Sequence, residues 1–190
     1  MKSLEKKIAL VYDSDKGSTI ANLLKLIAEK KGYCIITFDA REKPMDPCIG
    51  CFNCWVKTPG ICSQTKTDSY AYLKQVYNAS FIIHISKVTF GGFSSKIKGY
   101  MERLLPLAHP YFRKQNGEMH HVNRYKLNPN YLAIGYDCNS SNAEKIFVSL
   151  ANRNMINSGH GKFGQNHVAG FIYKGSENEL TSWFENILEA

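Results

Sequence analysis

Short apolar runs alternate with amphipathic segments along the whole chain. Five runs of six or seven residues are rich in β-branched and aromatic side chains, the pattern of strands buried in a parallel sheet, and they span Lys7–Asp13, Cys34–Asp39, Phe81–Ser86, Tyr131–Tyr136 and Val168–Tyr173. Between them, apolar residues recur every three to four positions, as in helices with one buried face, over Ile20–Lys31, Ser69–Ala79, Lys96–Leu107, Ala143–Asn154 and Glu177–Leu188. This alternation predicts right-handed βαβ units and not a β-sandwich.

Two segments fit neither pattern. Residues 47–66 contain Gly50, Pro59 and Gly60, which break regular elements, so we expect a folded loop there. Residues 108–130 form a long connection rich in aromatic, basic and histidine side chains, and connections of this length are typically lids, binding loops or subunit contacts. A chain of 190 residues is long enough for one full core and short for two, so we expect a single domain over residues 1–190.

Composition and charge narrow the functional classes. The formal net charge is +8, and 20 of the 24 lysines and arginines lie in residues 1–138. A basic surface attracts phosphorylated cofactors as well as nucleic acid. Because the basic residues are interleaved with acidic ones and no nucleic-acid-binding module is present, we expect no nucleic-acid partner.

Two further features of the sequence bear on location. The longest apolar runs have the length of strands, so we expect no membrane span. The charged N-terminal residues lead directly into the first predicted strand without an apolar signal region, which favours a cytoplasmic location.

The first predicted strand leads into its helix through Ser14-Asp15-Lys16-Gly17-Ser18-Thr19. Free backbone N–H groups and the positive end of the helix dipole make the start of a helix an anion site. The hydroxyl groups of Ser14, Ser18 and Thr19 can add donors. The loop is therefore a candidate phosphate site, although a simple helix cap at Ser18 or Thr19 would give the same pattern.

This stretch carries the first resemblance to a known family. The sequence Leu10-Val11-Tyr12-x-Ser14-x-x-Gly17-x-Thr19 resembles the flavodoxin signature that wraps the FMN phosphate. Leu23 stands where that signature usually has a small alanine. Asp13 and Asp15 would oppose a bound phosphate unless they point away from it.

The loop after the third predicted strand carries a second resemblance. Lys87–Ser95 contains the pair Gly91-Gly92, which removes side chains where a flat ring could lie against the backbone. It resembles the isoalloxazine-binding loop of the NADPH-dependent FMN reductases, with Lys87 in place of the proline often found there. A flexible Gly-Gly turn is the alternative interpretation.

The resemblance implies a flavodoxin-like, three-layer α/β/α doubly wound fold with a five-stranded parallel sheet in the order 2-1-3-4-5. Ligands of such sheets bind at the carboxyl ends of the strands. Because the flavin carries the chemistry, no catalytic side chain is expected. The residues expected to bind FMN are Ser14, Lys16, Gly17, Ser18, Thr19, Val88, Thr89, Phe90, Gly91, Gly92, Phe93, Tyr136, Asp137 and Cys138.

Four of the six cysteines fall within fifteen residues, with the spacing C-x2-C-x2-C-x7-C, at Cys48, Cys51, Cys54 and Cys62. Clustered thiols in a reducing compartment indicate metal or redox chemistry. The spacing resembles the motif of the iron–sulfur flavoproteins, in which four thiolates hold a [4Fe–4S] cluster near FMN. Three alternatives stay open: such a cluster, a zinc site, or unligated thiols at the rim of the FMN crevice. The two remaining cysteines, Cys34 and Cys138, are interpreted as small buried apolar residues.

The resemblance implies an FMN-dependent oxidoreductase that transfers electrons from NAD(P)H to a small-molecule or protein acceptor, such as a quinone or free flavin. The alternative is an FMN electron carrier or redox sensor, with or without a [4Fe–4S] cluster, that is reduced by a partner protein. The aromatic segment 108–130 favours a homodimer or homotetramer.

Overall fold

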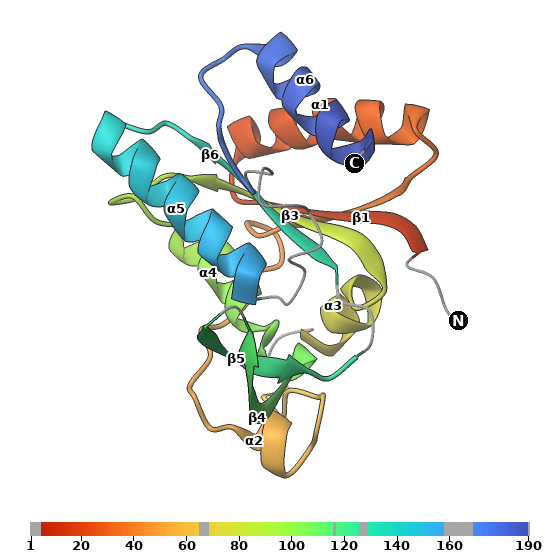
Figure 1. Ribbon diagram of the computed structural model, residues 1–190. Helices are drawn as coiled ribbons and strands as arrows, with labels where there is room; N and C mark the ends of the chain where they lie inside the picture. Colours follow the sequence, from red (N-terminus) through yellow and green to blue (C-terminus); the bar gives the residue numbers. More distant parts are fainter. Residues whose placement is uncertain (1–4, 65–68, 116, 126–128, 158–168, 190) are drawn as a thin grey trace.

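The computed structural model describes residues 5–64, 69–115, 117–125, 129–157 and 169–189. Five strands form one parallel sheet in the order β2-β1-β3-β6-β7 (Figure 1). Counted within the sheet, this is the predicted order 2-1-3-4-5, so the predicted fold class is confirmed. The strands are β1 (Glu5–Tyr12), β2 (Cys34–Asp39), β3 (Ala79–Lys87), β6 (Asn130–Tyr136) and β7 (Gly170–Ile172).

Helices cover both faces of this sheet. Helices α1 (Asp15–Lys30) and α6 (Glu177–Glu189) lie together on one face, and α3 (Ser69–Val76), α4 (Ser95–Glu102) and α5 (Ser141–Asn157) lie on the other (Figure 1). The central strands β1, β3 and β6 are buried on both faces, which explains their continuous apolar sequences. None of the helices in the described part of the chain has the length and apolarity needed to cross a bilayer.

Several element boundaries differ from the predicted ones. Helix α1 begins at Asp15 and not at Ile20, because Ser14 caps it: the Ser14 side chain accepts a hydrogen bond of 3.0 Å from the Gly17 N–H. Helix α4 ends at Glu102, five residues before the predicted end, and a short 3-10 helix, η1 (Leu105–Leu107), follows. Pro106 accounts for this end, since proline cannot continue a regular helix.

The connection at residues 108–130 contains an antiparallel hairpin of β4 (Ala108–Gln115) and β5 (Glu118–Asn123). The pair Asn116-Gly117 is a strong turn signal in the sequence, and Gly117 has the positive φ of 82° that such a turn needs. Figure 1 shows the hairpin below the main sheet, beside the short helix α2 (Asn53–Val56). The rings of Trp55 and His121 join the two, with centroids 4.9 Å apart.

The cysteine segment runs from the end of β2 along α4. The Tyr100 hydroxyl donates to the Lys43 carbonyl at 2.7 Å, and the Arg103 guanidinium donates to the Asp46 carbonyl at 2.6 Å. Gly99 lets the segment approach α4 closely, because an added Cβ would lie 2.4 Å from the Met45 oxygen. The prediction of no regular element is wrong for Asn53–Val56, where the chain enters a helical turn through Phe52 at φ 54°.

Candidate functional site at the carboxyl ends of the strands

The loops that follow β1, β3 and β6 meet around the side chain of Asp13. This carboxylate is only 7% exposed. It accepts hydrogen bonds from the Tyr136 hydroxyl, the Ser94 hydroxyl and, at 3.2 Å, the Lys87 N–H. Asp13 therefore fixes the three loops relative to one another at the edge of the sheet where the sequence predicts the binding site.

A chain of hydroxyl groups extends from Asp13 to the start of α1. Burial, and then the neighbouring Asp13 carboxylate, raise the pKa of Tyr136, so its hydroxyl stays protonated. The single proton of Tyr136 goes to Asp13, so the Ser14 hydroxyl must donate to the Tyr136 oxygen that it contacts. The Ser14 hydroxyl therefore points into the protein and not toward a ligand.

Of the other residues predicted to bind FMN at the start of α1, some side chains already bond within the protein and others are free to contact a ligand. The Thr19 hydroxyl donates to the Asp15 carbonyl of its own helix at 3.1 Å. The Lys16 ammonium lies 2.5 Å from Asp137 across the crevice, and both side chains are about half exposed. An exposed ion pair of this kind is weak, so Lys16 is available to an anion at the N-terminus of α1. Gly17 is buried against Tyr12, and Ser18 is half-buried.

The two carboxylates that would oppose a phosphate point away from this helix start. Asp13 faces inward to Tyr136 and Ser94. Asp15 forms an ion pair with Arg41, which also binds Asp39. Both negative charges are thereby held by other groups, and the anion site keeps the favourable field of the helix dipole.

The loop after β3 makes a tight turn at Phe90 and Gly91. The backbones of Thr89 and Gly92 exchange hydrogen bonds of 3.0 and 2.9 Å, and Phe90 and Gly91 both have positive φ, as in a type I′ turn. A Cβ on Gly91 would lie 2.8 Å from Ile146. The Gly-Gly pair is therefore an ordered turn.

The side chains of this loop face two ways. Phe90 is fully exposed at the rim, and Thr89 is exposed beside it, whereas Val88 and Phe93 are buried and shape the loop from below. In the third loop, Asp137 has φ 52°, and Cys138 is half-buried against the core. The residues predicted to bind FMN thus lie together at one edge of the sheet. Some are exposed and can contact a ligand, and others are buried beneath them.

Two of the four clustered cysteines contact α4. The Cys48 N–H donates to Glu102 at 2.8 Å, and the Cys62 sulfur lies 3.0 Å from Arg103. Both contacts are at the C-terminal end of α4, whereas Ser94, at its N-terminal end, contacts Asp13. Eight helical residues span about 12 Å. Cys48 and Cys62 thus lie about one helix length from the Ser94 end of α4, and a position of the four thiols at the rim of the crevice stays a prediction.

The described part of the chain contains no group of three histidine, cysteine, aspartate or glutamate side chains arranged to hold a metal ion. The thiols are neighbours all the same, since burial and then the charges of Cys62, Cys48 and Cys51 raise the pKa of Cys54. The prediction of a [4Fe–4S] cluster is thus not supported, and the residues as placed do not fit one. Cys34 is exposed on the edge strand β2, so its interpretation as a buried residue is wrong.

Sequence reasoning missed the residues that organise the site. The sequence indicates Asp13 only as a charge near the phosphate, and it gives no contact between Asp13 and Ser94. The signals were a serine directly before the helix of residues 95–102, which is a favoured N-cap, and an acidic residue directly after the first strand.

No family model and no curated protein sequence matches the chain. Solved structures do match it. They include rubredoxin oxygen:oxidoreductase from Desulfovibrio gigas, at 12% identity and a TM-score of 0.60 over 98% of this chain and 36% of that one. Azoreductase from Bacillus anthracis matches at 10% identity and a TM-score of 0.56, over 96% of this chain and 97% of that one. Flavodoxin 1 from Bacillus cereus matches at 9% identity and a TM-score of 0.55, over 96% of this chain and 97% of that one.

These similarities concern the fold, because the identities are low. This chain spans about a third of the length of the Desulfovibrio protein, at 36%, and nearly the whole of the azoreductase and the flavodoxin. The strand order and the arrangement of the helices agree with the match. The chain has the flavodoxin-like fold, and its three contact loops lie at the edge of the sheet where ligands of doubly wound folds bind.

Proposed function

We propose that the protein is an FMN-dependent oxidoreductase that takes electrons from NAD(P)H and passes them to an acceptor such as a quinone or free flavin. The observation that carries the proposal is the anion site at the start of α1. Asp13 and Asp15 are held by other groups, and Lys16 makes only an exposed ion pair with Asp137, which a phosphate can replace. The fold is similar to that of a flavodoxin and an azoreductase, which supports a flavin as the ligand.

The residues present fit a flat cofactor that carries a phosphate. The N-terminus of α1, Lys16 and Ser18 would hold the phosphate. The exposed Phe90 and the backbone of the 88–93 turn would lie beside the ring on one side, with the Asp137–Cys138 loop on the other. When bound, FMN supplies the electron-transfer chemistry. The role of the protein is to bind FMN, orient it and exclude water from it.

A titration with two ligands tests the phosphate site. Protein freed of flavin should bind FMN at one molecule per chain, measured by quenching of flavin fluorescence. Lys16→Ala should weaken FMN binding about three- to tenfold, because a charge-assisted contact to the phosphate is lost. Riboflavin, which lacks the phosphate, should bind the variant and the wild type alike.

Lys25→Ala is the matched control, since Lys25 is an equally exposed lysine further along the same helix. It should leave both affinities unchanged. Failure of the wild-type protein to bind either flavin would refute the proposed function. An equal loss of riboflavin and FMN binding in Lys16→Ala would show that Lys16 does not contact the phosphate, and so would contradict a phosphate site at the start of α1.

The second candidate is an electron carrier, which is favoured by the match to a flavodoxin over nearly its whole length. Rapid anaerobic mixing of the FMN-loaded protein with NADPH, and separately with NADH, distinguishes the two functions. An oxidoreductase should lose its flavin absorbance within seconds with one of the two nucleotides. A carrier should remain oxidised for minutes with both of them until its protein partner is added.

A further inference from the structure

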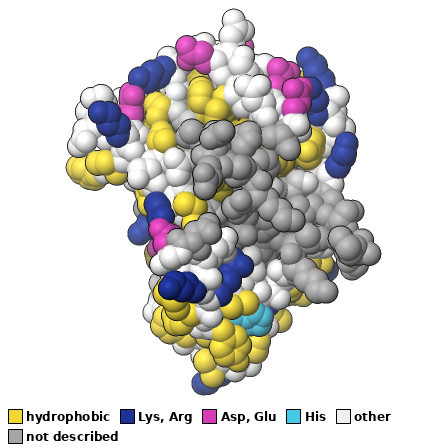
Figure 2. All heavy atoms as spheres, in the orientation of Figure 1, with side chains coloured by type: hydrophobic (Ala, Val, Ile, Leu, Met, Phe, Trp, Pro, Cys, Tyr) yellow, Lys and Arg dark blue, Asp and Glu magenta, His cyan; other side chains and the backbone are white. Residues whose placement is uncertain are grey.

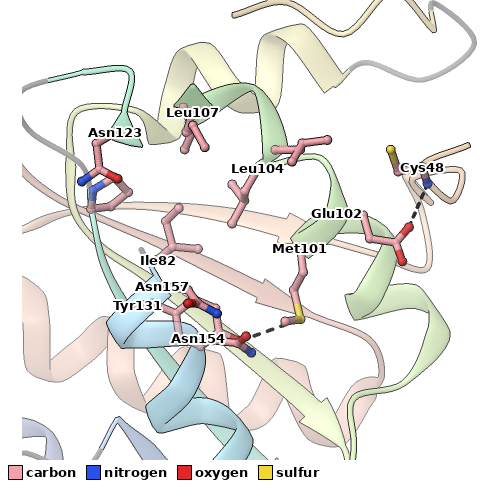
Figure 3. Close-up of a pocket in the computed structure, with 13 residues that line it drawn as sticks. Cys48, Ile82, Met101, Glu102, Leu104, Leu107, Asn123, Tyr131, Asn154 and Asn157 are labelled. Carbon is pink, nitrogen blue, oxygen red and sulfur yellow. Dashed lines mark hydrogen bonds between the residues drawn. The ribbon is translucent and has the colours of Figure 1, made fainter. Parts of the chain in front are cut away.

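A cavity of about 470 Å³ lies between the sheet and the C-terminal ends of α4 and α5 (Figure 3). Its floor is formed by Ile82 of β3 and Tyr131 of β6, and its apolar walls include Met101, Leu104 and Leu107. The cavity exists because α4 stops at Glu102 and the chain turns away through η1 into the hairpin. Helix α4 therefore does not reach over the N-terminal halves of β3 and β6, where Ile82 and Tyr131 lie.

This cavity is separate from the three loops of the proposed FMN site. Ile82 precedes Lys87 by five residues on β3, and Tyr131 precedes Tyr136 by five residues on β6. At a rise of about 3.3 Å per residue, the cavity floor lies roughly 16 Å from the edge where those loops meet. The cavity and the anion site at the start of α1 are therefore different places in the structure.

The walls favour a neutral ligand. Among the described lining residues, Glu102 is the only charged side chain. One of its oxygens accepts from the Cys48 N–H at 2.8 Å, and Lys98 lies 3.9 Å from the other. An anion would meet this carboxylate without a compensating cation in the lining, and a cation would lose its hydration against mainly apolar walls.

One end of the cavity offers hydrogen-bond donors. Asn154 and Asn157 are three positions apart on α5 and so share a face of the helix. The Asn154 Nδ2 is buried and has no acceptor within the described residues. The Asn157 Oδ1 lies 3.1 Å from His120 Nδ1, which leaves the amide nitrogen of Asn157 as a donor. The Tyr131 hydroxyl donates to the weak acceptor Met101 Sδ at 3.8 Å. Burial raises the pKa of Tyr131, and the nearby Asn154 side chain partly opposes this.

We infer that this cavity binds a neutral, mostly apolar molecule of one or two rings that carries a carbonyl oxygen. The oxygen accepts a hydrogen bond from the buried Asn154 amide nitrogen, for which the described residues provide no acceptor at hydrogen-bond distance. The rings lie against Leu104 and Leu107, which Figure 3 shows across from the asparagine end. The volume is within the range of small-molecule sites, and apolar cavities that stay dry readily take up apolar ligands.

The inference is tested with two neutral naphthalene fluorophores. Prodan carries a ketone, and N-phenyl-1-naphthylamine carries no carbonyl. Both should bind at one molecule per chain with a blue shift in emission, and excess FMN should displace neither. Leu104→Trp, which fills the cavity, should weaken both at least tenfold, whereas Leu26→Trp, on the exposed outer face of α1, should weaken neither.

Asn154→Leu isolates the hydrogen bond and does not depend on the filled variant being folded. It should weaken Prodan binding about three- to tenfold, the value of one neutral hydrogen bond, and leave N-phenyl-1-naphthylamine binding unchanged. Displacement of Prodan by FMN, binding that Leu104→Trp does not affect, or equal loss of both probes in Asn154→Leu would overturn the inference. These readouts do not depend on whether the protein oxidises NADPH.

Discussion

Asp13 holds its own loop to two other loops, whose contacting residues lie 74 to 123 positions further along the sequence. Asp13→Ala would leave the Tyr136 hydroxyl, the Ser94 hydroxyl and the Lys87 N–H without their acceptor in a buried site. We expect a loss of about 2–4 kcal/mol in the free energy of unfolding, because unpaired buried donors keep their full desolvation cost. Urea denaturation followed by circular dichroism measures it.

Asp15→Ala is the control for this substitution, since the Asp15 side chain is almost fully exposed and pairs only with Arg41 in the described residues. It should leave the urea midpoint nearly unchanged. Equal effects of the two substitutions would contradict the role assigned to Asp13. Tyr136→Phe combined with Asp13→Ala should be less than additive, because both remove the same hydrogen bond.

His84 gives the fold a predictable dependence on pH. Its ring is fully buried, neither nitrogen has a partner within the described residues, and burial lowers the pKa of His84 to about 3. In the unfolded chain this pKa is about 6.5, so below that pH the unfolded state binds the extra proton. Stability is therefore complete above the unfolded pKa and is lost as the pH falls toward 3.

From pH 7 to pH 5, this single group should lower the free energy of unfolding by about 2 kcal/mol. Urea midpoints measured at both pH values, in the wild type and in His84→Leu, check it. Between pH 7 and pH 5, the free energy of unfolding of His84→Leu should fall by about 2 kcal/mol less than that of the wild type. His109→Gln, at a half-exposed position, serves as control, and a wild-type loss reproduced in His84→Leu would show that another group is responsible.

At the scale of elements, the sequence predicted the parts that local physics determines. Buried runs such as Phe81–Ser86 and Tyr131–Tyr136 are predicted with errors of at most two residues at their ends, because a strand buried on both faces is mostly apolar. The edge strand Cys34–Asp39 was located at its observed bounds, yet its exposure was misjudged, since position in the sheet is a property of topology and not of the run itself.

The misplaced parts depend on contacts that are distant in the sequence. Nothing near Cys48 shows that its segment will follow α4, because that path rests on Gly99, Tyr100 and Arg103, some fifty residues later. Likewise, the sequence predicts that the hydroxyl of Ser14, the N-cap of α1, faces a ligand, but Tyr136 turns it inward. Val168, where the fifth predicted strand begins, and the Gly-rich stretch 158–165 lie outside the described residues.

Arg103 is the main tie between α4 and the cysteine segment. The side chain is only 2% exposed, and it donates to the carbonyls of Asp46 and Pro47 and contacts the Cys62 sulfur. Arg103→Met keeps the apolar stem and removes these bonds. We expect backbone hydrogen exchange across residues 46–62 to become at least about tenfold faster, because local opening loses its opposing contacts.

Mass-spectrometric hydrogen exchange measures this effect peptide by peptide, with β1 as an internal reference that should not change. Lys98→Met on the same helix is the control, because Lys98 is exposed and lies 3.9 Å from its acidic neighbour. Unaltered exchange in the cysteine segment of Arg103→Met would mean that the segment is held by its own contacts and not by α4.

At the scale of the whole molecule, apolar side chains gather at the end that carries the hairpin and α2 (Figure 2). Phe112 and Met119, on β4 and β5, are 63% and 65% exposed, and Tyr111 of β4 and Val56 of α2 are 68% and 76% exposed. A group of large exposed apolar side chains usually marks an interaction surface. This surface favours the homodimer or homotetramer expected from the aromatic segment.

The last prediction concerns this association. Light scattering coupled to size exclusion should give a mass of two or four chains at high micromolar concentration. The double substitution Phe112→Ser with Met119→Ser should shift the protein to the mass of one chain, because it removes two of the largest exposed apolar contacts without touching the core. Leu26→Ser, which removes an exposed leucine from α1 on the opposite side of the sheet, should leave the mass unchanged. A wild-type protein that stays a monomer, or a dimer that survives the double substitution, would place the interface elsewhere or remove it.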